Sequence, residues 1–403
     1  MTSRPPESAL IDVERDETAL RSLSDLDSPE AKAWLDSLST QFAEGAAALD
    51  ETSQFPYDNL ATLRRAGLLS LTVPRSFGGH EANLAQTLRV VQAIARGEPS
   101  TALIFVMQCL FHLRLQANPN WPAELKEHIA RDAVERGALI NSLRVEPELG
   151  SPSRGGLPGT VGRREGDEWV VSGRKLYSTG SPGLTWFAVW GRTDEASPRV
   201  GVFLVHRDTP GIRFGEPWNH LGMRATGSHE AIFDNVRIPF NHAVDLQLPG
   251  NPSGLDPTTL VWMNTLIPSI YDAVAQSARD WFVKWASERV PSGLDAPLST
   301  LDRFQQTAGR VQSLLLENRL LLEASARGTV SAPEAPTIKY LVSKHAIEAT
   351  QLCLEASSNP GLSRYNALER HYRNVLCSRI HTPQDDTVLG LLGRAAFSAA
   401  LSS

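Results

Sequence analysis

The spacing of hydrophobic positions changes twice along the chain. From about residue 28 to residue 137, apolar residues recur three and four positions apart, as in LATLRRAGLL and LAQTLRVVQAIAR, which predicts amphipathic helices. The run ALIFVMQCLFHL is apolar on almost every side and predicts a helix buried within this domain. Residues 1–27 are polar and acidic, and we expect them to form a flexible N-terminus.

Short runs of Val, Ile, Phe, Tyr and Trp follow between residues 138 and 250. Gly, Pro, Asp and Asn break these runs at intervals typical of β-structure. After the passage LQLPGNPSGLDP, residues 251–403 return to long helical stretches, the first of which Pro268 should kink or offset. Three such stretches and a terminal one after Asp386 predict an antiparallel bundle. We therefore expect an N-terminal α-helical domain, a middle β-barrel-like domain and a C-terminal four-helix bundle.

Composition narrows the range of partners and compartments. A chain of 403 residues can form two or three domains with substantial cores. Its net charge of −6 argues against nucleic acid or anionic membrane partners, and no apolar run reaches the ~20 residues of a membrane span. The N-terminus lacks the apolar segment of a secretory signal. Cys109, Cys353 and Cys377 form no ligand pattern, and we expect buried thiols in a reducing, cytoplasmic protein.

Several common catalytic motifs are missing from the sequence. It contains no Gly-rich dinucleotide fingerprint, P-loop, H-E-x-x-H, C-x-x-C or G-x-S-x-G. These motifs carry phosphate binding, zinc binding, thiol redox and serine-hydrolase chemistry, so none of these chemistries is indicated. The histidines are scattered, and a lone histidine is most often structural.

An ordered set of segments instead resembles a flavoenzyme family. The segments are GLLSLTVPRSFGG (67–79), VEPELGS (145–151), GRKLYSTG (173–180), LGMR (221–224) and FDNVRIP (233–239). In this order they resemble the acyl-CoA dehydrogenase superfamily. The resemblance implies a flavin, FMN or FAD, held without a dinucleotide-binding loop. It places these residues beside the isoalloxazine: Ser142, Val145, Ser151, Tyr177, Ser178 and Thr179.

A flavin needs hydrogen-bond donors at its pyrimidine edge and an aromatic or apolar wall along its ring, which these residues could supply. The alternative for residues 177–179 is an ordinary β edge with a turn at Gly180. The resemblance also implies that Trp186 packs on the flavin ring. It implies that Arg289 meets the cofactor phosphates of a neighbouring subunit in a homotetramer. The alternative for Arg289 is a solvated arginine at a helix end.

The C-terminal turn, HYRNVLCSRIHTPQDD (371–386), departs from the dehydrogenase pattern. In acyl-CoA dehydrogenases, a Glu in the matching segment removes the α-proton of the thioester. Counting from Arg373 places Thr382 at that position, and a threonine hydroxyl is no general base near neutral pH without its own activator. Some family members carry the Glu on the first helix of the last domain, where this chain has Pro268-Ser269-Ile270. Both positions therefore lack a carboxylate.

The same turn resembles reduced-flavin-dependent monooxygenases of this fold, such as dibenzothiophene monooxygenase. Arg373-Asn374 and His381-Thr382 match their pattern, while Gln384 stands where they have a second histidine. His381 is then the candidate proton donor for oxygen chemistry at flavin C4a. Polar neighbours surround it, so we do not expect its imidazole to stabilise a dry core. Ser142 and His112 are further candidate donors, although His112 also fits a satisfied core histidine.

The main interpretation is an oxygenase of a two-component system. It would use reduced FMN, or FADH2, with O2 and a small organic substrate such as an organosulfur compound, and a separate NAD(P)H:flavin reductase would supply the flavin. The first alternative is an FAD-dependent acyl-CoA dehydrogenase with Asp385 or Asp386 as a displaced base. The second is a catalytically silent protein that binds flavin or acyl-CoA.

Overall fold

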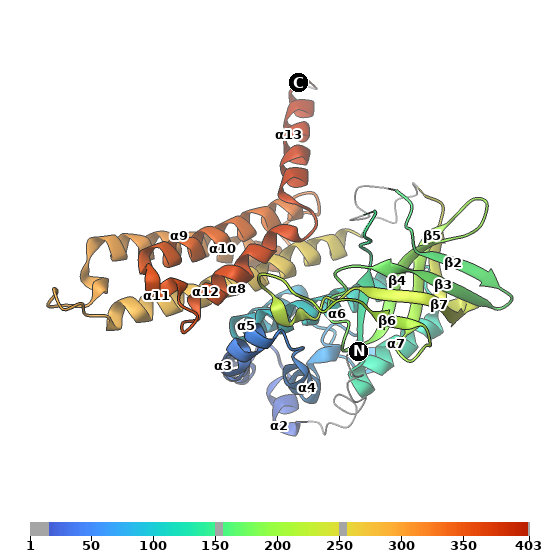
Figure 1. Cartoon of the computed structure of the whole chain (residues 1–403), viewed down its shortest axis with the longest axis horizontal. Coiled ribbons are helices and arrows are strands. Elements are labelled where there is room, and N and C mark those ends of the chain that lie inside the picture. The colour runs from blue at the N-terminus through green and yellow to red at the C-terminus, as the bar shows by residue number, and fades with distance from the viewer. Residues whose placement is uncertain (1–15, 150–155, 250–255, 402–403) are drawn as a thin grey trace.

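The N-terminal part of the chain is helical, as the hydrophobic spacing predicts. The computed structural model describes residues 16–149, 156–249 and 256–401 (Figure 1). The buried helix expected at ALIFVMQCLFHL is observed as the central part of α6, which packs between α5 and the sheet. The N-terminal elements are α2 (Glu17–Ser22), α3 (Pro29–Thr52), α4 (Tyr57–Arg65), η1 (Leu68–Ser70), η2 (Arg75–Phe77), α5 (Leu84–Gly97), α6 (Pro99–Ala117) and α7 (Ala123–Arg136).

Helix α2 lies within the stretch expected to be flexible. Asp16 caps it by accepting hydrogen bonds from the backbone N–H groups of Thr18 and Ala19, each at 3.0 Å. Ala19 and Leu23 are fully buried in the core of the helical domain. The domain therefore begins before residue 28, and residues 1–15 lie outside the described part of the chain.

The middle region forms one eight-stranded sheet. Its strands are β1 (Leu139–Leu143), β2 (Val161–Glu165), β3 (Glu168–Lys175), β4 (Leu184–Thr193), β5 (Val200–His206), β6 (Ile212–Phe214), β7 (Ala231–Pro239) and β8 (Ala243–Gln247). The order is β6-β7-β3-β2-β4-β5-β8, and β1 adds to β4 beside β2. β1 and β2 run parallel to β4, while the other pairs are antiparallel. Among the described residues, β6 and β8 do not pair with each other, so the sheet is open.

The C-terminal region is a helical bundle whose first helix packs against α5 and α6 of the N-terminal region. Its long helices are α8 (Pro257–Glu288), α9 (Asp302–Ala326) and α10 (Ala335–Ser357), with η6 (Leu298–Thr300) between α8 and α9. The shorter elements that follow are α11 (Asn359–Leu362), α12 (Leu368–Leu376) and η7 (Cys377–Ile380), and the chain ends in α13 (Asp385–Leu401). Pro268 lies inside α8, which continues past it as a single helix.

The terminal helix is not the fourth member of the bundle, contrary to expectation. α12 packs against α8 and α10, with Leu368 and Val375 fully buried. α13 instead stands away from the bundle (Figure 1). The other described elements leave most of its length uncovered, so it exposes these apolar side chains: Leu389, Leu391, Leu392 and Phe397.

Two expectations from composition can be compared with the structure. Cys109, Cys353 and Cys377 are free thiols, the first two buried and the third half-buried. In the part of the chain that the structure describes, every helix is too short or too polar to cross a bilayer.

Candidate functional site

The two segments predicted to contact a flavin lie side by side. The backbone N–H of Leu176 donates to the carbonyl of Val145 at 2.9 Å, which forms an isolated antiparallel bridge beyond the end of β1. Asn141 strengthens this junction, because its Nδ2 donates to the carbonyl of Thr179 at 2.9 Å. The sheet therefore brings residues 141–146 and 175–179 together, although the intervening residues 150–155, including Ser151, lie outside the described part.

A buried ion pair links these two segments. Lys175 Nζ lies 2.6 Å from Glu146 Oε1, and both side chains are almost fully buried. Thr160 also donates to Glu146 Oε1, through its hydroxyl at 2.6 Å and its backbone N–H at 3.0 Å. Burial lowers the pKa of Lys175 to about 8, and Glu146 opposes this shift. Burial opposes ionisation of Glu146, but its contacts with Lys175 and Thr160 outweigh burial and hold its pKa below the usual value.

Tyr177 supplies an exposed aromatic surface at this junction. Its side chain is 54% exposed, and its backbone has a left-handed φ of +54°. Trp218 and His220 stack on each other with ring centroids 3.7 Å apart, and both meet Tyr177 edge to face. Trp218 and His220 carry no local sequence signal for this site, because they lie 41 and 43 residues after Tyr177.

The hydroxyl groups beside Tyr177 differ in their accessibility. Thr179 Oγ1 is half-buried and lies 3.0 Å from Ser228 Oγ, which lies 2.8 Å from Thr226 Oγ1. Ser178 is 1% exposed, and its hydroxyl donates to the carbonyl of Lys175. An exposed ring next to a chain of hydroxyls fits the aromatic wall and polar donors that a flavin requires. Tyr177 and Thr179 are therefore the better placed of the three predicted contacts. The backbone N–H of Ser178 donates to the carbonyl of His229, and its carbonyl accepts from the N–H of Ser181.

Trp186 does not offer its ring to a ligand in this structure. It is 5% exposed, and its indole N–H donates to Asp132 Oδ2 of α7 at 2.7 Å. His128, His206 and His242 surround its ring. The indole is therefore already covered and hydrogen-bonded, which makes Trp186 part of the packing between α7 and the sheet rather than a flavin wall.

Ser142 and His112 occupy different environments. Ser142 lines a small cavity on the α6-facing side of the sheet, together with Arg114, Asn118 and Trp121. His112 is fully buried in α6, with Nε2 3.1 Å from the Gln108 side-chain nitrogen, and Nδ1 has no hydrogen-bond partner among the described residues. Burial lowers the pKa of His112 to about 4. This enclosure favours the core-histidine alternative over a catalytic donor.

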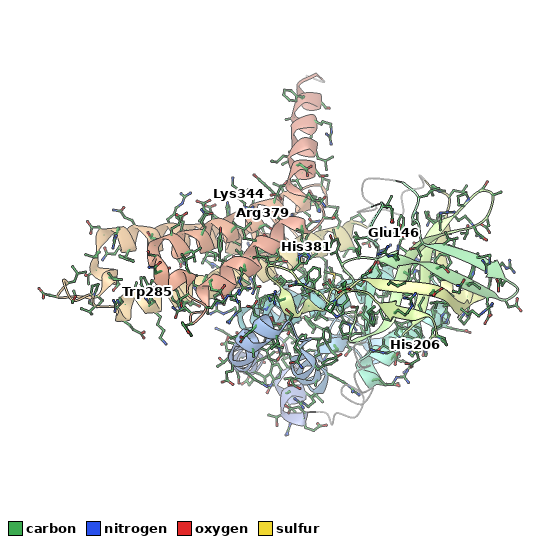
Figure 2. The ribbon with its side chains drawn as sticks, in the orientation of Figure 1. Glu146, His206, Trp285, Lys344, Arg379 and His381 are labelled. Carbon is green, nitrogen blue, oxygen red and sulfur yellow. The ribbon has the colours of Figure 1, made fainter. Side chains whose placement is uncertain are left out.

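The C-terminal turn packs against the bundle more closely than its polar sequence suggests. His381 Nε2 lies 2.5 Å from the hydroxyl of Tyr271, a fully buried residue of α8. Burial, with the nearby Lys339 charge, lowers the pKa of His381 to about 4. The imidazole is therefore half-buried, with one ring nitrogen bonded to the bundle core rather than to solvent. In Figure 2, His381 lies between the bundle and the sheet, on the side of Glu146.

The carboxylates near this turn are few. Asp385 begins α13, and its Oδ1 lies 3.4 Å from Nζ of the buried Lys339. Asp272 lies two residues beyond Pro268-Ser269-Ile270 but is fully buried, where it accepts hydrogen bonds from Asn318 and Gln276. Burial raises the pKa of Asp272 to about 6. Because Asp272 has no exposed surface, Asp385 is the better candidate for a displaced base.

Arg289 lies at the far end of α8. It is exposed at the helix C-terminus, four residues after Trp285. Figure 2 shows Trp285 at the end of the bundle opposite to Glu146. Within one chain, Arg289 is therefore remote from the junction of residues 145 and 177, so a role at the cofactor requires a second subunit.

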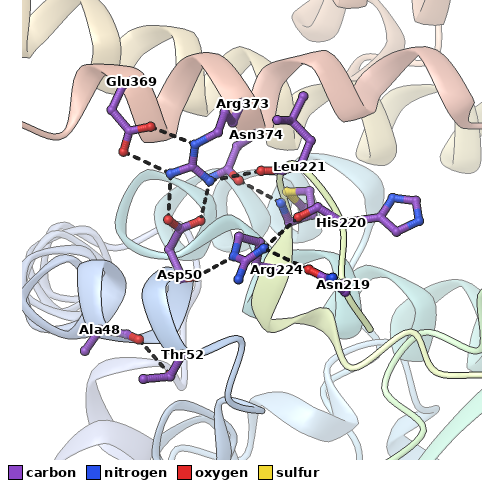
Figure 3. Close-up of polar contacts among 11 residues, drawn as sticks. Ala48, Asp50, Thr52, Asn219, His220, Leu221, Arg224, Glu369, Arg373 and Asn374 are labelled. Atoms are coloured by element: carbon purple, nitrogen blue, oxygen red, sulfur yellow. Dashed lines mark hydrogen bonds and ion pairs between the residues drawn. The ribbon is translucent and has the colours of Figure 1, made fainter. Parts of the chain in front are cut away.

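A single arginine joins all three regions next to this site (Figure 3). Arg373 of α12 binds both carboxylate oxygens of Asp50 in α3, at 2.9 and 2.6 Å, and both oxygens of Glu369, at 2.7 and 2.9 Å. It also donates to the carbonyl of Leu221, which follows β6, at 3.0 Å. Arg224 donates to the carbonyl of Asp50 at 2.6 Å. These contacts fix the orientation of the C-terminal turn relative to the other domains.

A helical domain, a sheet with an exposed aromatic junction and a helical bundle together define a three-domain flavoenzyme architecture. Comparison with known proteins identifies the family. The N-terminal, middle and C-terminal domain models of acyl-CoA dehydrogenase match residues 31–118, 145–236 and 267–397. The chain is also 33% identical over 380 residues to the putative acyl-CoA dehydrogenase YdbM of Bacillus subtilis, covering 92% of this chain and 98% of the relative. The chain belongs to the acyl-CoA dehydrogenase family.

Solved structures share the whole fold. Butyryl-CoA dehydrogenase from Megasphaera elsdenii matches with a TM-score of 0.79 and 18% identity, covering 93% of this chain and 100% of that one. KijD3 in complex with FMN and dTDP-3-amino-2,3,6-trideoxy-4-keto-3-methyl-D-glucose matches with a TM-score of 0.73 and 26% identity, covering 92% and 95%. The names of the curated relatives favour dehydrogenation over the oxygenation expected from the C-terminal turn.

Proposed function

We propose that this chain is an FAD-dependent dehydrogenase acting on an acyl-CoA thioester. The observation that carries the proposal is the end-to-end similarity to YdbM, at 33% identity, which spans all three domains. Bound flavin would accept the two electrons of the oxidation as a hydride equivalent. The chain's own contribution is to hold the ring, exclude water and remove a proton from the substrate.

The junction of residues 145 and 177 supports flavin binding in this proposal. Tyr177 would cover one part of the flavin ring. The hydroxyl of Thr179, which also contacts the hydroxyl of Ser228, would donate a hydrogen bond to the ring. The buried pair of Glu146 and Lys175 keeps the two backbone segments at a fixed separation. Rigid support of this kind is what orients a cofactor relative to its substrate.

Proton removal requires a base other than Thr382. Asp385 lies three residues further along the chain, and its side chain is 43% exposed. The ammonium group of Lys339 lies 3.4 Å from one of its oxygens and holds the carboxylate beside the turn. We therefore assign Asp385 as the displaced base. Asp386 is exposed and forms its side-chain hydrogen bond with the backbone of Thr387.

Oxygenation is the second candidate function, favoured by a specific observation. Thr382 occupies the position of the usual base, and His381 directly before it is held by Tyr271. A reaction of reduced flavin with O2 needs proton donors and no carboxylate base at the substrate carbon. The similarity to KijD3, whose complex contains FMN, is consistent with this alternative. An oxygenase would also require a flavin reductase as partner.

Anaerobic mixing with substrates distinguishes the two reactions. Protein loaded with FAD is mixed with a series of straight-chain and branched acyl-CoA thioesters, and loss of the oxidised-flavin absorbance is followed. Bleaching in the wild type and in Asp386→Asn, together with a loss of about 10²–10⁴-fold in Asp385→Asn, is the expected result. Absence of bleaching with every thioester, combined with an oxygenated flavin intermediate after reduced flavin meets O2, would replace dehydrogenation by oxygenation.

A further inference from the structure

Tyr271 and His381 form a contact that joins the C-terminal turn to the core of the bundle. The phenol oxygen and Nε2 are 2.5 Å apart, and the two ring centroids are 5.6 Å apart. The two residues are separated by 110 positions in the sequence. Tyr271 is fully buried within α8, so the contact fixes His381 against a rigid element rather than against another loop.

Both partners are neutral near pH 7. Burial raises the pKa of the Tyr271 phenol well above its ordinary value, so the phenol keeps its proton. Burial lowers the pKa of His381 to about 4, so the imidazole carries one proton, on either Nδ1 or Nε2. Among the described residues, His381 Nε2 is the only hydrogen-bond partner of the Tyr271 hydroxyl. A donated phenol proton therefore requires an unprotonated Nε2 and places the imidazole proton on Nδ1.

The charged and titratable groups around this pair favour the same arrangement. Lys339 of α10 is 1% exposed, and its positive charge disfavours protonation of His381. Asp385 of α13 lies 3.4 Å from Lys339 rather than beside the imidazole. Cys377 of η7 lies near Tyr271, and burial raises the pKa of this half-buried thiol to about 11, so it adds no charge near neutral pH. No carboxylate among the described residues pairs with His381 to favour the imidazolium.

We propose that Tyr271 is a positioning residue that holds neutral His381 as the Nδ1–H tautomer. The Nδ1–H group then faces away from Tyr271 and donates a hydrogen bond to an oxygen atom of the ligand bound at the turn. The role of His381 toward a ligand rests on the proposed flavin site, whereas its tautomer does not. The donor would serve a thioester carbonyl in dehydrogenation. A fixed tautomer matters because the other one would present a lone pair to that oxygen and repel it.

Raman difference spectroscopy tests the tautomer in the full chain without any ligand. Neutral imidazole gives different ring bands for its two tautomers, and subtracting the spectrum of His381→Gln from that of the wild type isolates His381 among the 10 histidines. We expect bands of the Nδ1–H form in the wild type and in the control Tyr365→Phe, whose ring is fully exposed. In Tyr271→Phe, a mixture with the Nε2–H form should appear. A wild-type spectrum of the Nε2–H form, or an unchanged spectrum in Tyr271→Phe, would overturn the proposal.

A double-variant cycle then tests whether Tyr271 acts through His381. The rate of flavin reduction by a reactive thioester is measured for Tyr271→Phe, His381→Gln and the double variant. We expect about tenfold loss in Tyr271→Phe, a larger loss in His381→Gln, and no further loss in the double variant, because residues that act as a unit are not additive. Additive losses would contradict a positioning role. If no thioester reduces the wild type, the proposed function fails while the tautomer result still stands.

Discussion

Removing the guanidinium of Arg373 should be among the most destabilising single changes outside the hydrophobic core. The side chains of Arg373, Asp50 and Glu369 are only 13%, 16% and 15% exposed. Arg373→Met keeps much of the aliphatic volume but leaves two neighbouring, largely buried carboxylates with Arg370 as the nearby cation and without their hydrogen-bonded guanidinium. Breaking a buried pair in this way costs roughly 3–5 kcal/mol.

Matched variants separate this effect from ordinary loss of a surface charge. Asp50→Asn leaves Arg373 paired with Glu369, so the loss should be smaller, about 1–3 kcal/mol. Arg131→Met removes a pair whose partners are 50% and 47% exposed and should cost about 0–1 kcal/mol. Replacing Arg373, Asp50 and Glu369 together by Met, Asn and Gln should recover much of the stability, since both carboxylates are removed with their cation and Arg370 keeps Glu98 as an opposite charge.

Thermal unfolding followed by circular dichroism provides the measurement. Three domains need not unfold together, so the first transition is compared between variants. For a unit of 150–250 residues, about 3 kcal/mol corresponds to a decrease of roughly 6–12 °C in its midpoint. Protease cleavage near Leu221 should increase in parallel, because Arg373 holds its carbonyl. An Arg373→Met midpoint no lower than that of Arg131→Met would refute the reasoning.

Three further outcomes follow from the same structure. The pKa of His112 in the folded protein, about 4, lies below its unfolded value near 6.5. The stability of the wild type should therefore decrease by up to roughly 3 kcal/mol as the pH falls through this interval. Urea midpoints measured at several pH values should fall less steeply for His112→Gln. Gly222→Ala should destabilise the protein by about 1–3 kcal/mol in urea titrations, because its Cβ would lie 2.3 Å from the carbonyl oxygen of Arg373. Gly309→Ala in α9 should instead stabilise it by about 0.4–1 kcal/mol, because open space surrounds that position. The wild type should be a homotetramer by light scattering, and Phe397→Asp, at a 76% exposed position of α13, should shift it toward smaller species without changing its circular dichroism.

The fold was predictable because hydrophobic spacing reports which face of each element is buried. The all-round apolar run of α6 correctly indicated a helix enclosed by other elements. The change to short runs after residue 138 correctly located the sheet. Assignment of the fourth bundle helix failed because α12 and α13 both have apolar positions at helical spacing. Sequence shows that such a face exists but not whether this chain or another covers it.

The candidate site was less predictable, because side-chain partners come from distant positions. Trp186 was expected at the flavin from its place in a motif, and its position in β4 is as expected. Strand alternation determines only that its side chain points to one face of the sheet. That face is covered by α7, whose Asp132 lies 54 residues earlier and accepts the indole N–H. Nothing near either residue in the sequence indicates this pairing.

The environment of His381 shows why local composition misled. Thr382, Gln384 and Asp385 are polar, and a turn of such residues is ordinarily solvated. The half-buried His381 instead contacts Tyr271 of α8 and lies near the charge of Lys339 of α10, residues that are 110 and 42 positions away in the sequence. The same helices also keep the imidazole neutral. A histidine charged near neutral pH could not accept the phenol proton at Nε2, so the contact with Tyr271 and the neutral state of His381 depend on each other.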